Sequence, residues 1–242
     1  GDDVEIILSN TPFYPAGGGQ VGDTGTMAAF DGQAAVYDTR KPVGDIIVHY
    51  AKISAGQVSV HDGVRAAVHI DRRLDIMRNH TATHLLHAAL RDVLGSHVRQ
   101  AGSRVASDHL RFDFTHMEAV NQEELDRIQA IVNDEVRGDL ALVKRQESYR
   151  DATERGALAF FDERYGESVR TIQIGEANPV SFELCGGTHL DRTGQIGMFR
   201  LISESSVGTG VRRIEAVTGR GGEAWVSERL HLLQQVSAKL RT

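Results

Sequence analysis

Apolar and polar residues alternate in short segments over residues 1–70 of the chain. These segments are rich in valine and isoleucine and are bounded by glycine, aspartate or proline, which is typical of short β-strands separated by turns. The expected strands are residues 4–9, 26–30, 34–40, 45–51, 57–61 and 64–70. Residues 11–25 contain too many glycines and prolines for a regular element, so we expect a shaped loop there. We therefore assign residues 1–70 to a small barrel-like or sandwich-like β-subdomain.

The hydrophobic period changes at residue 71 from alternation to helical spacing. Asp71 is placed to cap a helix, and Gly95 is placed to end it. The apolar positions that carry the pattern are Leu74, Met77, Ala82, Leu85, Leu86, Ala89, Leu90 and Leu94. This spacing predicts one long amphipathic helix over residues 71–95.

The rest of the chain mixes helices and strands without a regular βαβ alternation. We expect helices at residues 117–136, 151–161 and 223–240, and strands at residues 97–105, 109–116, 141–149, 168–175, 180–184, 198–207 and 210–218. This order favours an α+β fold over a doubly wound sheet. We divide it into a mixed core at 71–220 and a C-terminal helix at 221–242, which has no C-cap and is expected to lead into a missing region.

Composition excludes several classes of protein. The chain has 242 residues, 40% of them hydrophobic and 25% charged, which is close to the average for globular domains. No apolar run approaches the ~18 residues of a membrane span, and the N-terminus lacks the features of a signal peptide. One cysteine rules out an intramolecular disulfide framework and fits a reducing, cytoplasmic location. The net charge of 27 − 33 = −6 argues against indiscriminate coating of nucleic acid but allows a local basic patch.

Two pairs of potential metal ligands share the same four-residue spacing. His80 and His84 fall on one face of the long predicted helix, and Cys185 and His189 lie in a glycine-rich loop at residues 185–197. Three imidazoles and a thiolate suit a tetrahedral Zn²⁺ site. Thr81 stands where zinc proteases carry a catalytic glutamate, which argues against peptide cleavage.

Simpler interpretations of the same residues remain open. The histidine pair could be a surface accident and Cys185 a buried apolar residue. Alternatively, Cys185 could act as a thiolate nucleophile with a histidine base.

The loop at residues 11–25 contains three consecutive glycines, Gly17, Gly18 and Gly19, followed by Gln20. Glycines without side chains let a backbone approach a ligand closely. A phosphate-binding P-loop also needs a lysine, which this loop lacks. We take these residues as candidates for substrate binding, with an ordinary turn between strands as the alternative.

Further polar residues flank the metal pattern. A glutamine and hydroxyl groups near a metal could orient a water molecule or recognise a substrate hydroxyl, although ordinary polarity at a strand edge explains them equally well. The candidates are Thr83, Gln100 and Ser103. Nearby arginines could contact phosphates, or could simply pair with neighbouring carboxylates on a solvated face. Those chosen as candidates for substrate binding are Arg72, Arg73 and Arg213.

Taken together, these motifs resemble the editing domain of alanyl-tRNA synthetase. The resemblance covers almost the whole chain and is carried by TPFYPAGGGQVGDTG, DRRLDIMRNHTATHLLHAALRDVLG, HVRQAGSRV, LRFDF, FELCGGTHLDRTGQIGMFRLISE and GVRRIEAVTG. It implies hydrolysis of Ser-tRNA(Ala) and Gly-tRNA(Ala). It also implies Zn²⁺ at His80, His84, Cys185 and His189, with Thr83, Gln100 and Ser103 lining the editing pocket.

The resemblance further implies that the partners are mischarged tRNA(Ala) and, in cis, the aminoacylation and C-terminal regions of a synthetase. Nothing in the chain resembles an aminoacylation core with its ATP site, so we do not expect it to charge tRNA. Two alternatives stay open. The chain could be a freestanding AlaX-type deacylase, which shares these motifs, or a non-catalytic tRNA-binding module with a structural zinc.

Overall fold

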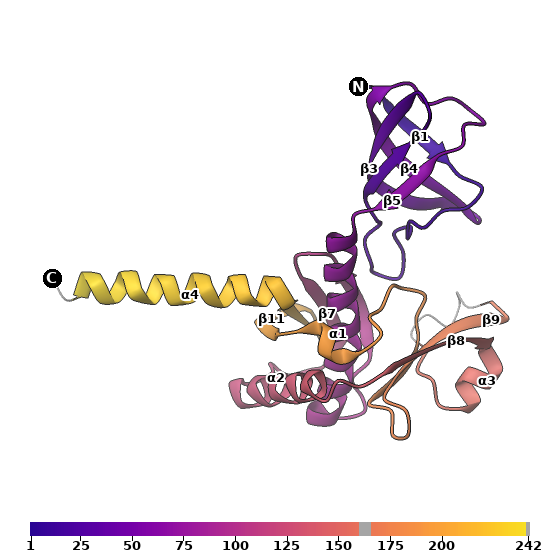
Figure 1. The fold of residues 1–242 in the computed structure, drawn as a ribbon. Helices are drawn as coiled ribbons and strands as arrows, with labels where there is room; N and C mark the ends of the chain where they lie inside the picture. The colour runs from indigo at the N-terminus through magenta and orange to yellow at the C-terminus, as the bar shows by residue number, and fades with distance from the viewer. Residues whose placement is uncertain (160–165, 241–242) are drawn as a thin grey trace.

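The computed structural model describes residues 1–159 and 166–240, and Figure 1 shows their arrangement. The N-terminal segment forms a five-stranded antiparallel sheet in the order β1-β4-β3-β2-β5. Its strands are β1 (Asp3–Ile7), β2 (Gly25–Ala28), β3 (Gly32–Val43), β4 (Ile46–Gly56) and β5 (Arg65–Val68). The predicted β-rich segment is therefore confirmed, while closure of this sheet into a barrel stays a prediction.

Alternation of buried and exposed residues along β3 gives this sheet its apolar face. The side chains of Phe13, Met27 and Val36 are buried in a cluster of their own beneath the sheet. The predicted strand at residues 57–61 is wrong. There Asp62 accepts a hydrogen bond from the backbone of Ser59, and His61 has a φ of 76°, so the chain turns instead of extending.

The long helix α1 (Ile70–Leu94) confirms the change of period and ends at Gly95, which has a φ of 114°. Its predicted N-cap is wrong, because the helix begins before Asp71. The N-cap is His69, which makes no capping hydrogen bond through its side chain, and Asp71 lies in the first turn. From Asn79 onward most of the helix is buried, so its central turns form part of the core.

A second antiparallel sheet packs against α1 in the order β11-β12-β7-β6. Its strands are β6 (Gln100–Val105), β7 (Leu110–Thr115), β11 (Phe199–Gly208) and β12 (Val211–Thr218). Helix α2 (Gln122–Arg137) packs on α1 and contacts β11. It begins later than the predicted residue 117 because Asn121 and Glu124 form a capping box that fixes the start.

The third sheet has the order β10-β9-β8 and carries the second glycine-rich loop at its edge. Its strands are β8 (Leu142–Ser148), β9 (Ser168–Ile174) and β10 (Ser181–Leu184), and the loop contains the short 3-10 helix η2 (Thr193–Ile196). Helix α3 (Tyr149–Glu154) begins before the predicted 151–161, because Ser148 caps its start, and it is shorter because it ends at its C-cap, Arg155. Residues 160–161 of that prediction lie outside the described residues.

Helix α4 (Gly219–Leu240) projects away from the sheets, as Figure 1 shows. Leu230, Leu233, Val236 and Leu240, which form its predicted apolar stripe, are all more than half exposed. Within the described ranges, no helix combines the length and apolar character that crossing a bilayer requires. The α+β class is confirmed, and the division at residues 70 and 220 stays a prediction.

Candidate metal centre and adjoining pocket

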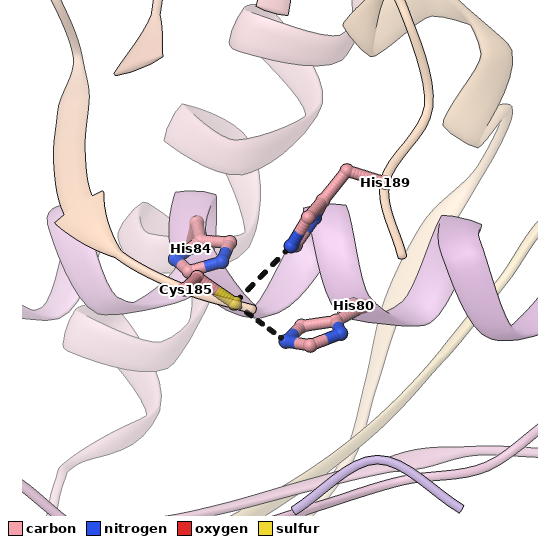
Figure 2. A group of neighbouring side chains, drawn as sticks. All are labelled: His80, His84, Cys185 and His189. Carbon is pink, nitrogen blue, oxygen red and sulfur yellow. Dashed lines mark hydrogen bonds between the residues drawn. The ribbon is translucent and has the colours of Figure 1, made fainter. Parts of the chain in front are cut away.

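The predicted ligands come together at one point between α1 and the loop that follows β10 (Figure 2). His80 and His84 extend from successive turns of α1, and their rings stack with centroids 5.6 Å apart. Sγ of Cys185 lies 3.4 Å from Nε2 of His80 and 3.2 Å from Nε2 of His189. All the candidate ligand atoms of this group lie within 4.8 Å of one another. A helix pair and a loop pair, about a hundred residues apart in the chain, therefore form one cluster.

Each histidine of the cluster holds a partner on its Nδ1 atom, the ring nitrogen facing away from the centre. For His80 the partner is Oε1 of Gln20 at 2.7 Å, for His84 it is Oε2 of Glu183 at 2.5 Å, and for His189 it is Oγ1 of Thr81 at 3.4 Å. Such contacts select the ring tautomer and direct the opposite nitrogen toward a metal.

The donor set fits Zn²⁺. Nε2 of His84 is buried and makes no hydrogen bond within the parts of the chain that the structure describes, an arrangement that is costly without a ligand. The side chains are buried, with His80, His84 and His189 only 5%, 6% and 2% exposed. Solvent water is therefore poorly placed to hydrogen-bond to their ring nitrogens. Three imidazole nitrogens and one sulfur also match the ligand preferences of a tetrahedral zinc site.

Electrostatics favour the protonation state that a metal ligand requires at Cys185. Burial opposes ionisation of its thiol, but the neighbouring imidazoles of His80 and His189 hold the pKa of Cys185 well below its usual range. Burial, with the charge of His80, lowers the pKa of His189 to about 3. A thiolate and a neutral imidazole are the forms that bind zinc.

Glu183 is the buried anion next to the cluster. Burial opposes charge at both members of the pair, yet the charge of Glu183 raises the pKa of His84 to about 10, and the charge of His84 lowers the pKa of Glu183 to about 2. The second oxygen of Glu183 lies 2.9 Å from Nδ1 of His87. Glu183 therefore compensates positive charge on the helix face that carries the proposed ligands.

The glycine-rich N-terminal loop packs directly against this centre. Oε1 of Gln20 contacts His80 and also accepts the backbone N–H of Thr188 at 2.9 Å. Val105, at the end of β6, donates its N–H to Gly19 O and accepts the N–H of Val21. Gln20 is itself buried. Its contacts therefore support a metal ligand and hold the glycine loop, and its side chain is not exposed to solvent.

A pocket of about 550 Å³ opens beside the metal ligands. It is lined by Tyr14, Pro15, Ala16, Gly17, Gly18, Gly19, Lys41, Gly102, Ser103, Leu184, Cys185, Gly186 and Gly187. The three glycines and Ser103 thus line one pocket, which Cys185 connects to the metal group, and their contact with a substrate stays a prediction.

The other polar candidates lie behind this lining. Nε2 of Gln100 donates to Oγ of Ser103 at 3.0 Å, so Gln100 acts on the pocket through Ser103. Thr83 is buried, and its hydroxyl donates to the backbone oxygen of Asn79 at 2.8 Å. The functional roles assigned to these residues stay predictions.

The candidate arginines all have intramolecular partners. Arg72 donates to Gly22 O at 2.9 Å, and Arg73 forms an ion pair with Asp23, so both tie the glycine loop to α1. Arg213 donates twice to Asp113, at 2.7 and 2.9 Å, across strands β12 and β7. Their contact with phosphate stays a prediction, whereas their contribution to the fold is visible.

Comparison with known proteins places the chain among the synthetases. Residues 169–215 match the family described as the threonyl and alanyl tRNA synthetase second additional domain, and residues 1–72 match class II (A) tRNA synthetases. Alanine–tRNA ligase of Chloroflexus aurantiacus is 49% identical over 251 residues, which cover 100% of this chain. The same enzyme of a Roseiflexus species is 50% identical over 259 residues, which cover 99% of it. The chain belongs to the alanyl-tRNA synthetase family.

The chain spans 28% and 29% of the lengths of these two relatives. The second additional domain match contains Cys185 and His189, and the class II match contains the loop with Gln20. His80 and His84 lie between the two matched segments. The metal cluster therefore joins residues of one matched segment to helix residues outside both.

Sequence reasoning missed Glu183, His87 and Lys41. Two of them have a signal in the sequence. Glu183 precedes Cys185 by two residues, so the alternation of a strand turns both side chains to one side. His87 follows His84 by three residues on the same helix face. Lys41 has no local signal, because its approach to the pocket depends on how the N-terminal sheet packs.

Two adjacent glycines offer a matched test of the centre. A methyl group on Gly187 would overlap Cε1 of His80 and lie 3.0 Å from Oε1 of Gln20, whereas one on Gly186 would meet nothing within 4 Å. We expect Gly187→Ala to lower zinc affinity by about tenfold, because it displaces His80 and its supporting amide. Gly186→Ala should leave zinc affinity unchanged. Competition with a chromophoric chelator measures both, and equal affinities would contradict this account.

Proposed function

We propose that this chain hydrolyses the ester bond of mischarged tRNA(Ala), removing serine and glycine and sparing alanine. The observation that carries the proposal is that Cys185 belongs both to the metal-binding group and to the wall of a pocket built from two glycine-rich loops. An ester placed in that pocket would lie beside the cluster. Membership of the alanyl-tRNA synthetase family supports this substrate class.

Zn²⁺ would be held by His80, His84, Cys185 and His189, and when bound it supplies positive charge that can polarise a carbonyl or hold a substrate group. The chain's own part is to admit and orient the ester. Methyl groups placed on Gly18 or Gly186 would meet no atom within 4 Å, so the backbone there leaves room for a ligand.

Ser103 supplies one of the two hydroxyl groups on the pocket wall, and we assign it the recognition of serine. Its oxygen accepts a hydrogen bond from Gln100, which leaves its own hydrogen for a substrate oxygen or a water molecule. An aminoacylation site sized for alanine cannot strongly reject glycine or serine. A second site is therefore needed that selects its substrate by a property other than size. A site that hydrogen-bonds the serine hydroxyl leaves a polar group unpaired when alanine binds.

We expect the wild-type chain to deacylate Ser-tRNA(Ala) and to spare Ala-tRNA(Ala). An unpaired buried polar group costs about 1–3 kcal/mol, roughly a factor of 5 to 150. Ser103→Ala and Gln100→Ala should each lower the rate of hydrolysis of the seryl ester by a factor in that range. Thr83→Val tests the remaining candidate with little change in volume. Single-turnover deacylation, with zinc content measured in parallel, checks all three.

Wild-type rates on Ser-tRNA(Ala) in every one of these variants would refute the assignment of the pocket. Absence of hydrolysis by the zinc-loaded wild type would instead favour a second function. A set of four protein ligands resembles a structural zinc site, in which the chain would bind tRNA without cleaving it. In that case zinc removal should weaken binding of uncharged tRNA(Ala), measured by filter retention.

We also propose that the remainder of a synthetase acts with this chain in cis, because the relatives are more than three times its length. With a net charge of −6, attraction to tRNA must come from local cations, so binding by this chain should be weak and sensitive to salt.

A further inference from the structure

Among the residues that line the pocket within the described ranges, Lys41 alone carries a cationic side chain. The other lining groups are glycines, apolar residues, two hydroxyl groups and the thiol of Cys185. Lys41 comes from the N-terminal sheet, while Cys185 comes from the loop after β10. The cation and the metal ligand therefore approach one cavity from different parts of the fold.

An irregularity in β3 places this lysine. The register between β3 and β4 shifts between Arg40 and Val43, and Lys41 lies within the shift. Such bulges turn side chains away from their regular direction and are frequent beside active sites. Two residues earlier, Thr39 O accepts the N–H of Ala16 at 2.8 Å, which fixes β3 against the glycine loop. The strand and the pocket wall are thus held together next to Lys41.

Lys41 is also free to change its partner. Its ion pair with Asp45 at 2.5 Å is on the surface, where the Asp45 side chain is fully exposed and that of Lys41 is 42% exposed. Exposed pairs of this kind contribute little to stability. By contrast, the partner of Arg73 is 1% exposed and that of Arg213 is 11% exposed, so those guanidinium groups are committed to the fold.

We propose that Lys41 binds the phosphate on the 5′ side of the terminal nucleotide of the substrate RNA. The proposal rests on the proposed function, which places the aminoacyl ester near Cys185. The nucleoside would then occupy the pocket, and its 5′-phosphate would be the anionic group that must lie near the exposed cation. Lysine ammonium groups bind phosphate as point charges, without the fixed geometry that an arginine requires.

The decisive experiment compares three seryl esters that differ in their phosphates: Ser-tRNA(Ala), 3′-O-seryl-AMP and 3′-O-seryl-adenosine. Lys41→Gln keeps a polar side chain, one bond shorter than that of lysine, and removes its charge. We expect it to lower kcat/KM by about tenfold on the two substrates that carry the phosphate. It should leave kcat/KM on seryl-adenosine unchanged. Lys52→Gln, an exposed lysine on β4 of the same sheet, is the matched control and should behave as wild type on all three.

Salt dependence gives a second readout. Loss of one phosphate contact on a single-stranded end should reduce the slope of log kcat/KM against log salt by about 0.7 for Lys41→Gln. Lys41→Arg should keep the wild-type slope. An equal loss on all three substrates would show that Lys41 acts at the ester and would overturn the phosphate assignment, as would an effect of Lys52→Gln equal to that of Lys41→Gln.

Failure of the proposed function can be distinguished from failure of the phosphate assignment. If the wild type cleaves none of the esters, binding of the trinucleotide CCA and of adenosine still tests the subsite. Weaker binding of CCA by Lys41→Gln, with unchanged binding of adenosine, would then support the phosphate contact in a protein that is not a deacylase. Equal binding of CCA by wild type and Lys41→Gln would refute it.

Discussion

Replacing Cys185 with alanine should reduce the zinc content from about one ion per chain to near zero and abolish deacylation with it. Sγ of Cys185 lies 3.4 Å from Nε2 of His80 and 3.2 Å from Nε2 of His189, so the substitution removes the one anionic group of the proposed ligand set. Elemental analysis of the purified variant measures the effect. His231→Ala, on exposed α4, serves as the control and should retain its zinc.

His84→Ala tests the same centre from the helix, but it also removes one of the partners of the buried carboxylate of Glu183. Loss of one partner of a buried charged pair typically costs about 3–5 kcal/mol, so this variant can lose its fold as well as its zinc. Cys185→Ala removes a smaller group and is the cleaner test. Circular dichroism separates loss of fold from loss of metal. Full zinc content in both variants would contradict the assigned ligands.

Glu183→Gln should lower zinc affinity by about 10- to 100-fold, although Glu183 is not itself a proposed ligand. Its two oxygens accept from His84 and His87, and Ser181 donates to one of them at 3.2 Å. Glutamine has nearly the same volume but only one accepting oxygen, so its amide hydrogens would face an imidazole N–H. His84 would then lose the tautomer and orientation that direct Nε2 toward the metal.

The same substitution should cost about 1–3 kcal/mol in free energy of unfolding, because a buried donor loses its acceptor. Glu147→Gln provides the control. Glu147 accepts from Thr171 and pairs with Arg155 on the third sheet, so its loss should lower stability and leave zinc affinity unaltered. Chelator competition, with Co²⁺ absorption spectra to report ligand geometry, distinguishes the two. If Glu183→Gln bound zinc with wild-type affinity, the supporting role assigned to Glu183 at the metal centre would be refuted.

The sequence predicts those features that depend on local period. The helical spacing before Gly95 establishes α1, and the spacing of four residues places His80 and His84 on one face. The starts of helices are less well predicted, because a cap such as Asn121 competes with earlier residues that suit a helix equally well. The turn at Ser59 likewise overrides an alternation that suits a strand.

Features that depend on contacts between distant residues do not follow from the sequence in this way. Arg73 and Arg213 suit phosphate binding by residue type, yet the fold places Asp23 and Asp113 against them. The part that Lys41 plays at the pocket depends on a bulge and on the docking of a separate sheet. The residue type tells which ligands a side chain can bind. The tertiary structure decides whether that side chain is already paired within the fold or can reach a ligand.

The position of Gln20 has a thermodynamic consequence. One amide oxygen contacts Nδ1 of His80 and holds the N–H of Thr188, so the same atom supports a metal ligand and anchors the N-terminal loop. If metal binding favours the orientation of His80 that Gln20 stabilises, then docking of the loop must strengthen metal binding by the same coupling free energy. Occupancy of the centre would thus set how firmly Gly17, Gly18 and Gly19 are held. Metal binding and docking of the loop that forms one wall of the pocket would thus stabilise each other.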